Sequence, residues 1–274
     1  MKKNIKVNIK KGFLITITDQ TGNSLYFSKP PEKLVCLVPS LTETIADAGL
    51  ENHLAGITKF CVHPMSLRDK VRIIGGTKNP RVKDIFALKP DLIIANKEEN
   101  RHEDIEAFRQ FTQVYVSDIK TSHDVSLFLS FLQTLYKTDG CHHLIEQIEN
   151  LHNLPVRLKI PTCYLIWKDP LMTIGNDTFI HHMMEKYGFS NVFGNKLRYP
   201  QISYSKIEEY NPEIIMLSTE PYPFKETDIS NLSHMFPASK VVLVDGEMFS
   251  WYGSRIIKAN GYLNQLYSSH LYKK

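Results

Sequence analysis

The sequence predicts an α/β fold with two similar lobes, each built on a sheet of parallel type. The main observation is a repeat: residues 85–98 (IFALKPDLIIANKE) and residues 207–220 (IEEYNPEIIMLSTE) share one pattern at a constant offset of 122. Each copy reads as a helix end, a proline turn, a buried strand and a polar tip that carries Glu98 or Glu220. Ligands of parallel α/β sheets bind beyond the carboxyl ends of the strands, so we expect a ligand cleft between the lobes.

The first lobe, residues 1–120, is predicted to open with a β-hairpin. Phe13–Thr18 and Ser24–Phe27 flank a turn that contains glycine and asparagine. Ser40 stands three residues before Glu43, which is the spacing of a capping box and predicts a helix from about Leu41 to Ala48. The remaining elements predicted here are strands at 34–38, 55–58, 92–95 and 113–116, and helices at 82–88 and 103–111.

The segment 121–153 is the second observation behind the fold prediction. Its apolar residues recur with helical spacing, and it contains one glycine, Gly140, and no proline. We therefore expect one long helix, with any bend at Gly140, that joins the lobes as a rigid rod.

The second lobe, residues 154–274, is predicted to repeat the alternation of the first. Its apolar runs are short and rich in β-branched residues, and the segments between them have helical periodicity. The predicted strands are 162–167, 214–217 and 241–244, and the predicted helices are 177–186, 204–210, 229–235 and 254–267.

Composition narrows the function classes. With 42 % hydrophobic and 23 % charged residues among 274, the chain has the make-up of a globular protein with room for two domains. Its net charge of +4 is spread along the chain, which does not predict nucleic-acid binding. We also expect the protein to be a monomer. Cys36 and Cys163 lie in apolar runs typical of buried thiols, and none of the four cysteines forms a C-x-x-C pair.

The N-terminal residues also carry an expectation about location. The first twenty residues include lysines but no apolar core of a secretory signal, and no run of 18 apolar residues occurs anywhere. The sequence thus predicts a cytoplasmic protein if Met1 is the true start.

Several segments, in the same order along residues 12–267, resemble one family: the ABC-transporter substrate-binding proteins for cobalamin, haem and iron–siderophore complexes. These segments are LVCLVPSLTETIADAGL…LAGIT, IIGGTKNP, FALKPDLIIAN, LMTIGNDTFIHHMM, YPQISYSKIEEYNPEIIMLSTEPYPF and VLVDGEMFSWYGSR. The resemblance is greatest to the cobalamin-binding branch. It implies two α/β lobes joined by one backbone helix, a metal chelate as transported ligand, and no catalysis. Cobalamin is the first expected ligand, with haem and ferric siderophores as alternatives.

The resemblance also implies location and partner. Members of the family are periplasmic or on the cell surface, and one glutamate per lobe docks on arginines of an ABC permease. The alignment places His102, next to Glu103, and Ser205 at the two docking positions. Neither matches, so the docking roles are not carried over.

The ligand site implied by the resemblance lies on the loops that follow the strands. These loops combine aromatic side chains with polar tips, which suits a large planar ligand. Trp167 and Trp251 are the only tryptophans, with core packing as the alternative role, and His63 could be an axial ligand to cobalt or iron. The predicted ligand-binding residues are Ser40, Phe60, His63, Thr77, Lys78, Asn79, Lys97, Glu98, Trp167, Glu220, Tyr222, Met248, Phe249, Trp251 and Tyr252.

Two other functions stay open at this point. The motifs G-x-S-x-G, the P-loop, G-x-G-x-x-G and H-E-x-x-H are all absent from the sequence, so the enzymes that use them are not predicted. A chelatase-like enzyme would use His63 with Glu98 or Glu220, by analogy of fold alone. An intracellular corrinoid or haem carrier or sensor would fit the missing signal and the unmatched docking positions.

Overall fold

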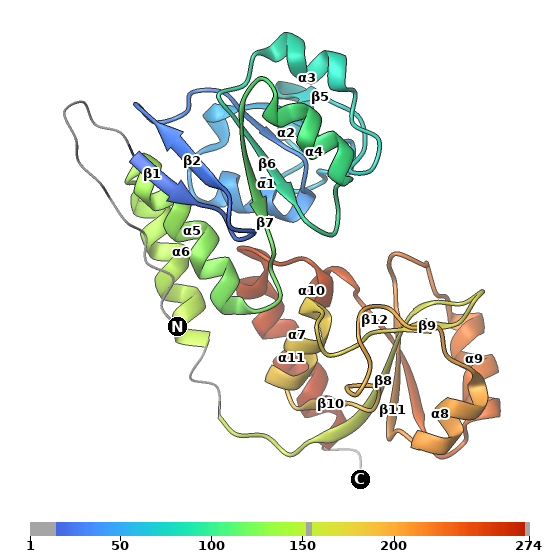
Figure 1. Cartoon of the computed structure of the whole chain (residues 1–274). Coiled ribbons are helices and arrows are strands. Elements are labelled where there is room, and N and C mark those ends of the chain that lie inside the picture. Colours follow the sequence, from blue (N-terminus) through green and yellow to red (C-terminus); the bar gives the residue numbers. More distant parts are fainter. Residues whose placement is uncertain (1–14, 152–154, 272–274) are drawn as a thin grey trace. The chain divides into compact units, whose positions relative to one another are not determined.

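The computed structural model describes residues 15–151 and 155–271, and these form two compact units (Figure 1). Unit 1 contains the described residues up to Asn150 together with Gly253–Arg255, and unit 2 contains the rest. Each unit holds one sheet of mainly parallel strands with helices packed on it, as the sequence predicts. The predicted α/β fold with two similar lobes is therefore confirmed.

The sheet of unit 1 is parallel throughout and has the strand order β5-β4-β3-β6-β7. Its central strands β3 and β6 are buried at every residue, as expected when helices cover both faces of a parallel sheet. The strands are β3 (Leu34–Cys36), β4 (Leu54–Ile57), β5 (Arg72–Ile73), β6 (Leu92–Asn96) and β7 (Gln113–Ser117). The helices are α1 (Pro39–Asp47), η1 (Glu51–His53), α2 (Leu67–Lys70), α3 (Val82–Leu88), α4 (His102–Arg109), α5 (Ser122–Tyr136) and α6 (Asp139–Asn150).

The sheet of unit 2 has four parallel strands in the order β10-β8-β11-β12, and the short β9 pairs with β8 in the antiparallel direction. The strands are β8 (Ile160–Trp167), β9 (Met172–Thr173), β10 (Phe189–Asn191), β11 (Ile214–Ser218) and β12 (Lys240–Val244). The helices are α7 (Phe179–Lys186), α8 (Tyr204–Tyr210), α9 (Glu226–Met235), α10 (Glu247–Ser250) and α11 (Arg255–Leu271), of which α11 begins with one residue of unit 1. Sequence reasoning missed η1, α2, α10, β5, β9 and β10, which are all four residues or shorter.

The repeat seen in the sequence is a repeat of structure. At the offset of 122, α3 and β6 of unit 1 coincide with α8 and β11 of unit 2, with identical lengths. Lys89 and Asn211 end the two helices in the left-handed conformation, one residue before the repeated proline. The order β4-β3-β6-β7 in unit 1 also corresponds to β10-β8-β11-β12 in unit 2.

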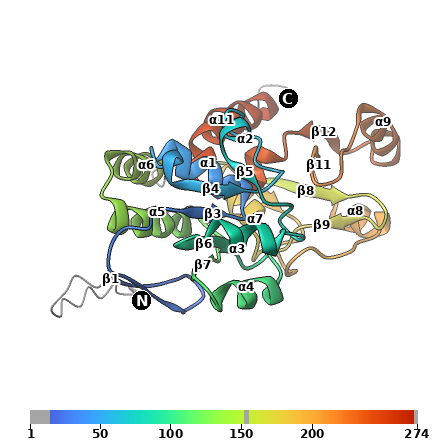
Figure 2. The same cartoon turned by 90° about the horizontal axis from the view of Figure 1, so that it is seen from above.

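The single long helix predicted for 121–153 is wrong, because this segment forms α5 and α6, which pack side by side within unit 1 (Figures 1 and 2). Lys137 adopts the left-handed conformation and ends α5. The Thr138 hydroxyl then accepts a hydrogen bond from the backbone N–H of Cys141 and caps α6. Gly140 lies in the first turn of α6, where a Cβ would stand 2.4 Å from the carbonyl oxygen of Ala48. Residues 152 and 153 of the predicted helix lie outside the described residues.

The capping box predicted for Ser40 and Glu43 is also wrong. Helix α1 begins at Pro39, and no side chain caps it. Glu43 instead forms a buried, two-pronged ion pair with Arg255, with N–O distances of 2.8 and 2.9 Å. The neighbouring Thr44 hydroxyl accepts a hydrogen bond from the backbone N–H of Ser254 at 2.9 Å. These contacts fix Gly253–Arg255 in unit 1, although the residues on both sides of this segment belong to unit 2.

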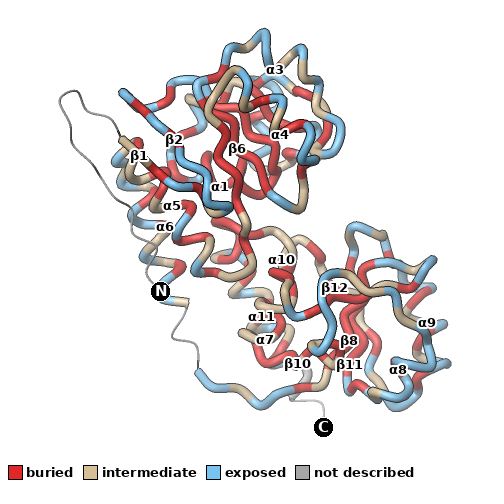
Figure 3. The backbone as a smooth tube through the Cα atoms, in the orientation of Figure 1, coloured by how far each residue is buried: buried red, intermediate tan, exposed pale blue. Residues whose placement is uncertain are grey.

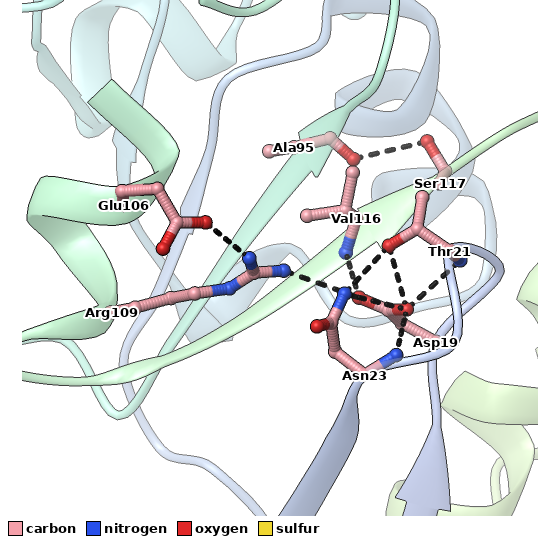
Figure 4. Close-up of polar contacts among 8 residues, drawn as sticks. All are labelled: Asp19, Thr21, Asn23, Ala95, Glu106, Arg109, Val116 and Ser117. Carbon is pink, nitrogen blue, oxygen red and sulfur yellow. Dashed lines mark hydrogen bonds and ion pairs between the residues drawn. The ribbon is translucent and has the colours of Figure 1, made fainter. Parts of the chain in front are cut away.

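The hairpin of β1 (Ile15–Thr18) and β2 (Ser24–Phe27) is confirmed for the described residues, and β2 lies against the edge strand β7 (Figure 1). Its turn is organised by the buried Asp19 carboxylate, which accepts bonds from Thr21 and Asn23 (Figure 4). The other carboxylate oxygen accepts the backbone N–H of Val116 and lies 3.7 Å from Arg109. The hairpin thus satisfies an N–H of the outer strand that would otherwise be exposed at a sheet edge.

Each unit has its own core, made where the buried strands meet the inner faces of the helices (Figure 3). The four cysteines are buried and unpaired with one another, in line with the predicted buried thiols. Burial raises the pKa of the Cys36 thiol to about 12, which makes it a poor nucleophile at neutral pH. Within the described part of the chain, no helix has the length and apolar character needed to cross a membrane.

Gly140→Ala should destabilise the protein by about 1–3 kcal/mol, because the added methyl group would be forced against the Ala48 carbonyl. The matched control is Gly261→Ala in α11, where a Cβ meets nothing within 4 Å. That change should stabilise the protein by about 0.5–1 kcal/mol through helix propensity. Urea unfolding of both variants measures the difference, and equal effects would contradict the close approach at Gly140.

Arg255→Ala should cost about 3–5 kcal/mol of stability, because it leaves the Glu43 carboxylate buried without its partner. Arg101→Ala removes a pair with Asp104 in which the arginine is largely exposed, and should cost less than about 1 kcal/mol. The double change Glu43→Leu with Arg255→Met should recover most of the loss. Similar unfolding free energies for the two single variants would argue against a buried pair.

Candidate functional site

Both sheets have a topological switch point, where the chain reverses its direction of winding. In unit 1 the chain runs from β3 outward to β4 and then returns to β6 on the other side, and in unit 2 it does the same with β8, β10 and β11. Ligands of such sheets bind at the carboxyl ends of the two strands that flank the switch point. The relevant loops are therefore those after β3 and β6 in unit 1, and after β8 and β11 in unit 2.

Unit 1 brings several predicted residues together on the loop after β6 and on the neighbouring loops after β4 and β5. The exposed ring of Phe60 lies against Gly76, where a Cβ would be 3.2 Å from it, and the Lys59 ammonium stands over the same ring. The neighbouring Lys78 ammonium donates a hydrogen bond to the backbone oxygen of Glu98 at 2.5 Å. The loop after β5, which carries Thr77, Lys78 and Asn79, is thereby tied to the tip of β6.

The tip of β6 is held by polar side chains of its own. Asn96, the last residue of the strand, accepts the backbone N–H groups of Glu98 and Glu99. Lys97 pairs with Asp118 at 2.9 Å, and Asn100 donates to the Thr77 carbonyl at 2.9 Å. The result is a polar rim beside the exposed aromatic ring of Phe60.

Unit 2 presents a second cluster, which is richer in aromatic side chains. Trp167, at the end of β8, is 38 % exposed and meets Tyr222 edge to face, with ring centroids 5.5 Å apart. Because the ring is exposed, the core role considered for Trp167 does not apply. Its indole N–H donates to the backbone oxygen of Asp169. Tyr222 continues the cluster through a contact with Phe224. Phe224 is buried in the core of unit 2, so the cluster presents Trp167 to solvent and is anchored in the core through Tyr222 and Phe224.

Glu220 occupies the tip of β11, the position that matches Glu98 in the repeat. Its Oε1 accepts hydrogen bonds from the Ser250 hydroxyl at 2.7 Å and from the Trp251 indole N–H at 3.1 Å. Burial raises the pKa of this carboxyl group, and the charge of nearby Glu247 raises it further. Glu220 thus joins the loop after β11 to the short helix α10.

The other predicted residues differ in their exposure. Phe249 is fully buried and packs on Tyr164 in the core of unit 2, while Tyr252 is buried against Phe179. Ser40 is buried in the first turn of α1. Phe249 is therefore a core residue of unit 2 and does not line the candidate site. His63, on the loop after β4, and Met248, in the short helix α10, are both half-buried.

Sequence reasoning missed Ser218 and Ser250. The Ser218 hydroxyl donates to the Glu220 carbonyl at 2.5 Å and accepts a hydrogen bond from Tyr164 at 3.1 Å. The repeat contained a signal for Ser218, because it matches Asn96, the residue that organises the other tip. No comparable signal points to Ser250, whose role depends on a contact with a residue thirty positions away.

The described residues do not form a metal site made of protein side chains alone. No group of three or more histidine, cysteine or acidic side chains gathers within the residues that the structure describes. A single axial histidine, as predicted for His63, is not addressed by that observation and stays a prediction.

The two predicted docking positions are not equivalent in the structure. Ser205 is the second residue of α8, is exposed, and shares a hydrogen bond with Ser203. By the offset of 122, its counterpart in unit 1 is Lys83, the second residue of α3, whereas His102 begins α4. The equivalent surface positions therefore carry a lysine and a serine.

Comparisons with known proteins find relatives in sequence and a likeness in fold. No protein-family model matches the chain. The vitamin B12-binding protein of Photorhabdus laumondii is 25 % identical over 254 residues, which cover 90 % of each chain. The uncharacterised ABC transporter substrate-binding lipoprotein YvrC of Bacillus subtilis is 23 % identical over 219 residues, 74 % of this chain and 69 % of YvrC. Among solved structures, the periplasmic vitamin B12-binding protein BtuF of Vibrio cholerae superposes with a TM-score of 0.76 at 20 % identity, covering 89 % of this chain and 99 % of BtuF.

The predicted resemblance to ABC-transporter substrate-binding proteins is confirmed. The relatives are named as binding proteins and not as enzymes. The likeness to BtuF shows that the two-lobed fold is shared.

Glu220→Gln should make the protein more stable above pH 7, because the amide keeps an acceptor for Ser250 and Trp251 but carries no buried charge. A carboxyl group whose pKa is raised by folding stabilises the native state at low pH, and this contribution is lost as the pH rises through the folded pKa. The stability gain of the variant should therefore grow from pH 4 to pH 8. Thermal unfolding across this range measures it, and a gain confined to acidic pH would contradict the sign.

Proposed function

We propose that this protein is the substrate-binding component of an ABC-type importer and that its ligand is a corrinoid, with cobalamin as the first candidate. The observation that carries the proposal is the agreement between relatives named as vitamin B12-binding proteins and the repeated switch-point loops of this chain. The ligand is cargo, and no chemical step is required of the protein. The name of YvrC, an ABC transporter substrate-binding lipoprotein, supports a place of action outside the cytoplasm and a membrane permease as partner.

The chemistry of the loops supports a large, partly apolar ligand. Each unit carries an exposed aromatic ring on these loops, Phe60 in unit 1 and Trp167 in unit 2. A ring that packs on the flat face of a macrocycle buries apolar area worth roughly 25 cal/mol per Å². The polar tips around Glu98 and Glu220 supply donors and acceptors of the kind that orient such a ligand through its peripheral amides.

Most of the predicted residues that remain candidates for ligand contact lie on strand-end loops, whereas Ser40 and Met248 lie in the short helices α1 and α10. His63 is a candidate axial ligand on the loop after β4, with imidazole nitrogen as the donor atom. The other candidates are Ser40, Phe60, Thr77, Lys78, Asn79, Lys97, Glu98, Trp167, Glu220, Tyr222, Met248, Trp251 and Tyr252.

Cyanocobalamin should bind the purified protein with one-to-one stoichiometry in isothermal calorimetry, and Trp251→Ala should weaken the affinity by more than about tenfold. The indole offers a large ring at a strand-end loop, and its removal deletes contact area from the proposed site. Phe86→Ala is the matched control, because Phe86 is an exposed aromatic residue of α3 outside the strand-end loops.

The choice of ligand is decided by testing haem and a ferric siderophore in the same experiment. Binding of one of these in place of cyanocobalamin would keep the transport function and replace the ligand. Absence of binding for all three would overturn the proposal.

A further inference from the structure

The carboxylate of Glu220 uses its two oxygens unequally. Oε1 accepts from both Ser250 and Trp251, at 2.7 and 3.1 Å. Within the part of the chain that the structure describes, Oε2 accepts no hydrogen bond from a protein group. One oxygen therefore holds α10 and the residue that follows it, while the other is available for a proton.

The position of Glu220 is fixed from several sides. Its Cγ lies against the backbone of Gly246, where even a Cβ would come within 2.5 Å. The backbone N–H of Gly246 in turn donates to the Thr219 hydroxyl at 2.9 Å. The Ser218 hydroxyl hydrogen-bonds to the backbone N–H and carbonyl of Glu220 itself. Because the tip of β11 and the start of α10 are packed in this way, the carboxylate reaches the Trp251 indole from a rigid base.

We propose that Glu220 positions the Trp251 indole, and that protonation of Glu220 makes the orientation of this indole depend on pH. The ionised carboxylate accepts charge-assisted hydrogen bonds from the indole N–H and the Ser250 hydroxyl, and these are stronger than bonds to a neutral acceptor. A proton on Oε2 leaves Oε1 as a neutral carbonyl oxygen, so both bonds weaken. Trp251 is held most firmly when Glu220 is charged.

The groups around Glu220 favour proton uptake. The charged groups that act on it, Glu247 on α10 and Asp245 at the end of β12, are both acidic. Tyr164 of β8 faces the tip through Ser218, and Tyr262 of α11 accepts the backbone N–H of Asp245. Burial and these two acids raise the pKa of Glu220 above its ordinary value, although the bonds from Ser250 and Trp251 act in the opposite direction. Neutralisation of Glu220 thus begins at a less acidic pH than for an exposed glutamate.

The equivalent residue of unit 1 is placed differently. Glu98 is reached by Lys78 through its backbone oxygen, and unit 1 has no tryptophan for it to hold. The positioning role therefore belongs to unit 2 alone and is not a general property of the repeat.

Trp251 fluorescence tests the proposal without any ligand. Trp167→Phe leaves Trp251 as the only tryptophan, and its emission is recorded between pH 4 and pH 8. A protonated carboxyl group quenches indole emission more strongly than a carboxylate does, so intensity should fall on acidification in a single step. The midpoint should lie above the ordinary glutamate value.

Three further changes in the Trp167→Phe background assign this step. Glu220→Gln should abolish it. Glu247→Gln should move the midpoint to lower pH, because it removes a like charge. Glu226→Gln, which changes an exposed glutamate of α9, should leave the step where it is. A step that survives Glu220→Gln, or an emission that is flat across this range, would overturn the proposal.

The consequence for binding rests on the proposed function. At pH 7.5, Glu220→Ala should weaken cyanocobalamin binding by about tenfold, and Glu220→Gln by less than about threefold. For the unmodified protein the affinity should fall by a similar factor, less than about threefold, as the pH is lowered through the fluorescence midpoint, because protonation also leaves a neutral acceptor. If cyanocobalamin does not bind at all, the proposed function fails while the fluorescence step still decides the role of Glu220. If it binds with equal affinity to all three proteins, Glu220 does not position Trp251 for the ligand.

Discussion

The buried ion pair between Glu43 and Arg255 holds the short segment Gly253–Arg255 in unit 1, between two stretches of unit 2. The chain passes from one unit to the other after Asn150, after Tyr252 and after Arg255. The last two crossings enclose Gly253–Arg255, which this pair and the Thr44 hydroxyl tie to α1. Two charges with so little access to solvent are stable together because each satisfies the other with good geometry. The pair thereby anchors the first residue of α11 on unit 1.

The repeat explains why two halves with little identical sequence present similar loops. In both, a left-handed residue and a proline turn end a helix, a fully buried strand follows, and a polar side chain at the strand end binds the backbone of the tip. That side chain is Asn96 in one unit and Ser218 in the other. The shared frame places one glutamate at each switch point, and the surroundings then give the two glutamates different roles.

The properties of Glu220 follow from its neighbours and not from its position in the repeat. It is packed against a glycine backbone, linked to a tryptophan, and surrounded by acids. Glu98 has the same place at the tip of its strand but supports its loop through the backbone. A binding surface built on such a frame can change its ligand through the loop residues while the strands stay the same, as the different loop chemistry of the two units illustrates.

The sequence by itself determined most of the longer helices and strands and their order, because the apolar period and the proline and glycine signals are local. Helices α3 and α8 have the predicted bounds, and the repeat located both glutamates. Only the tertiary structure decided that residues 121–151 form two helices, since Gly140 is needed for a contact with Ala48 and the break lies at Lys137. It also decided the partners of Glu43 and Glu220, which lie 212 and about thirty positions away. Such pairings depend on how distant segments pack, and no local pattern in the chain encodes them.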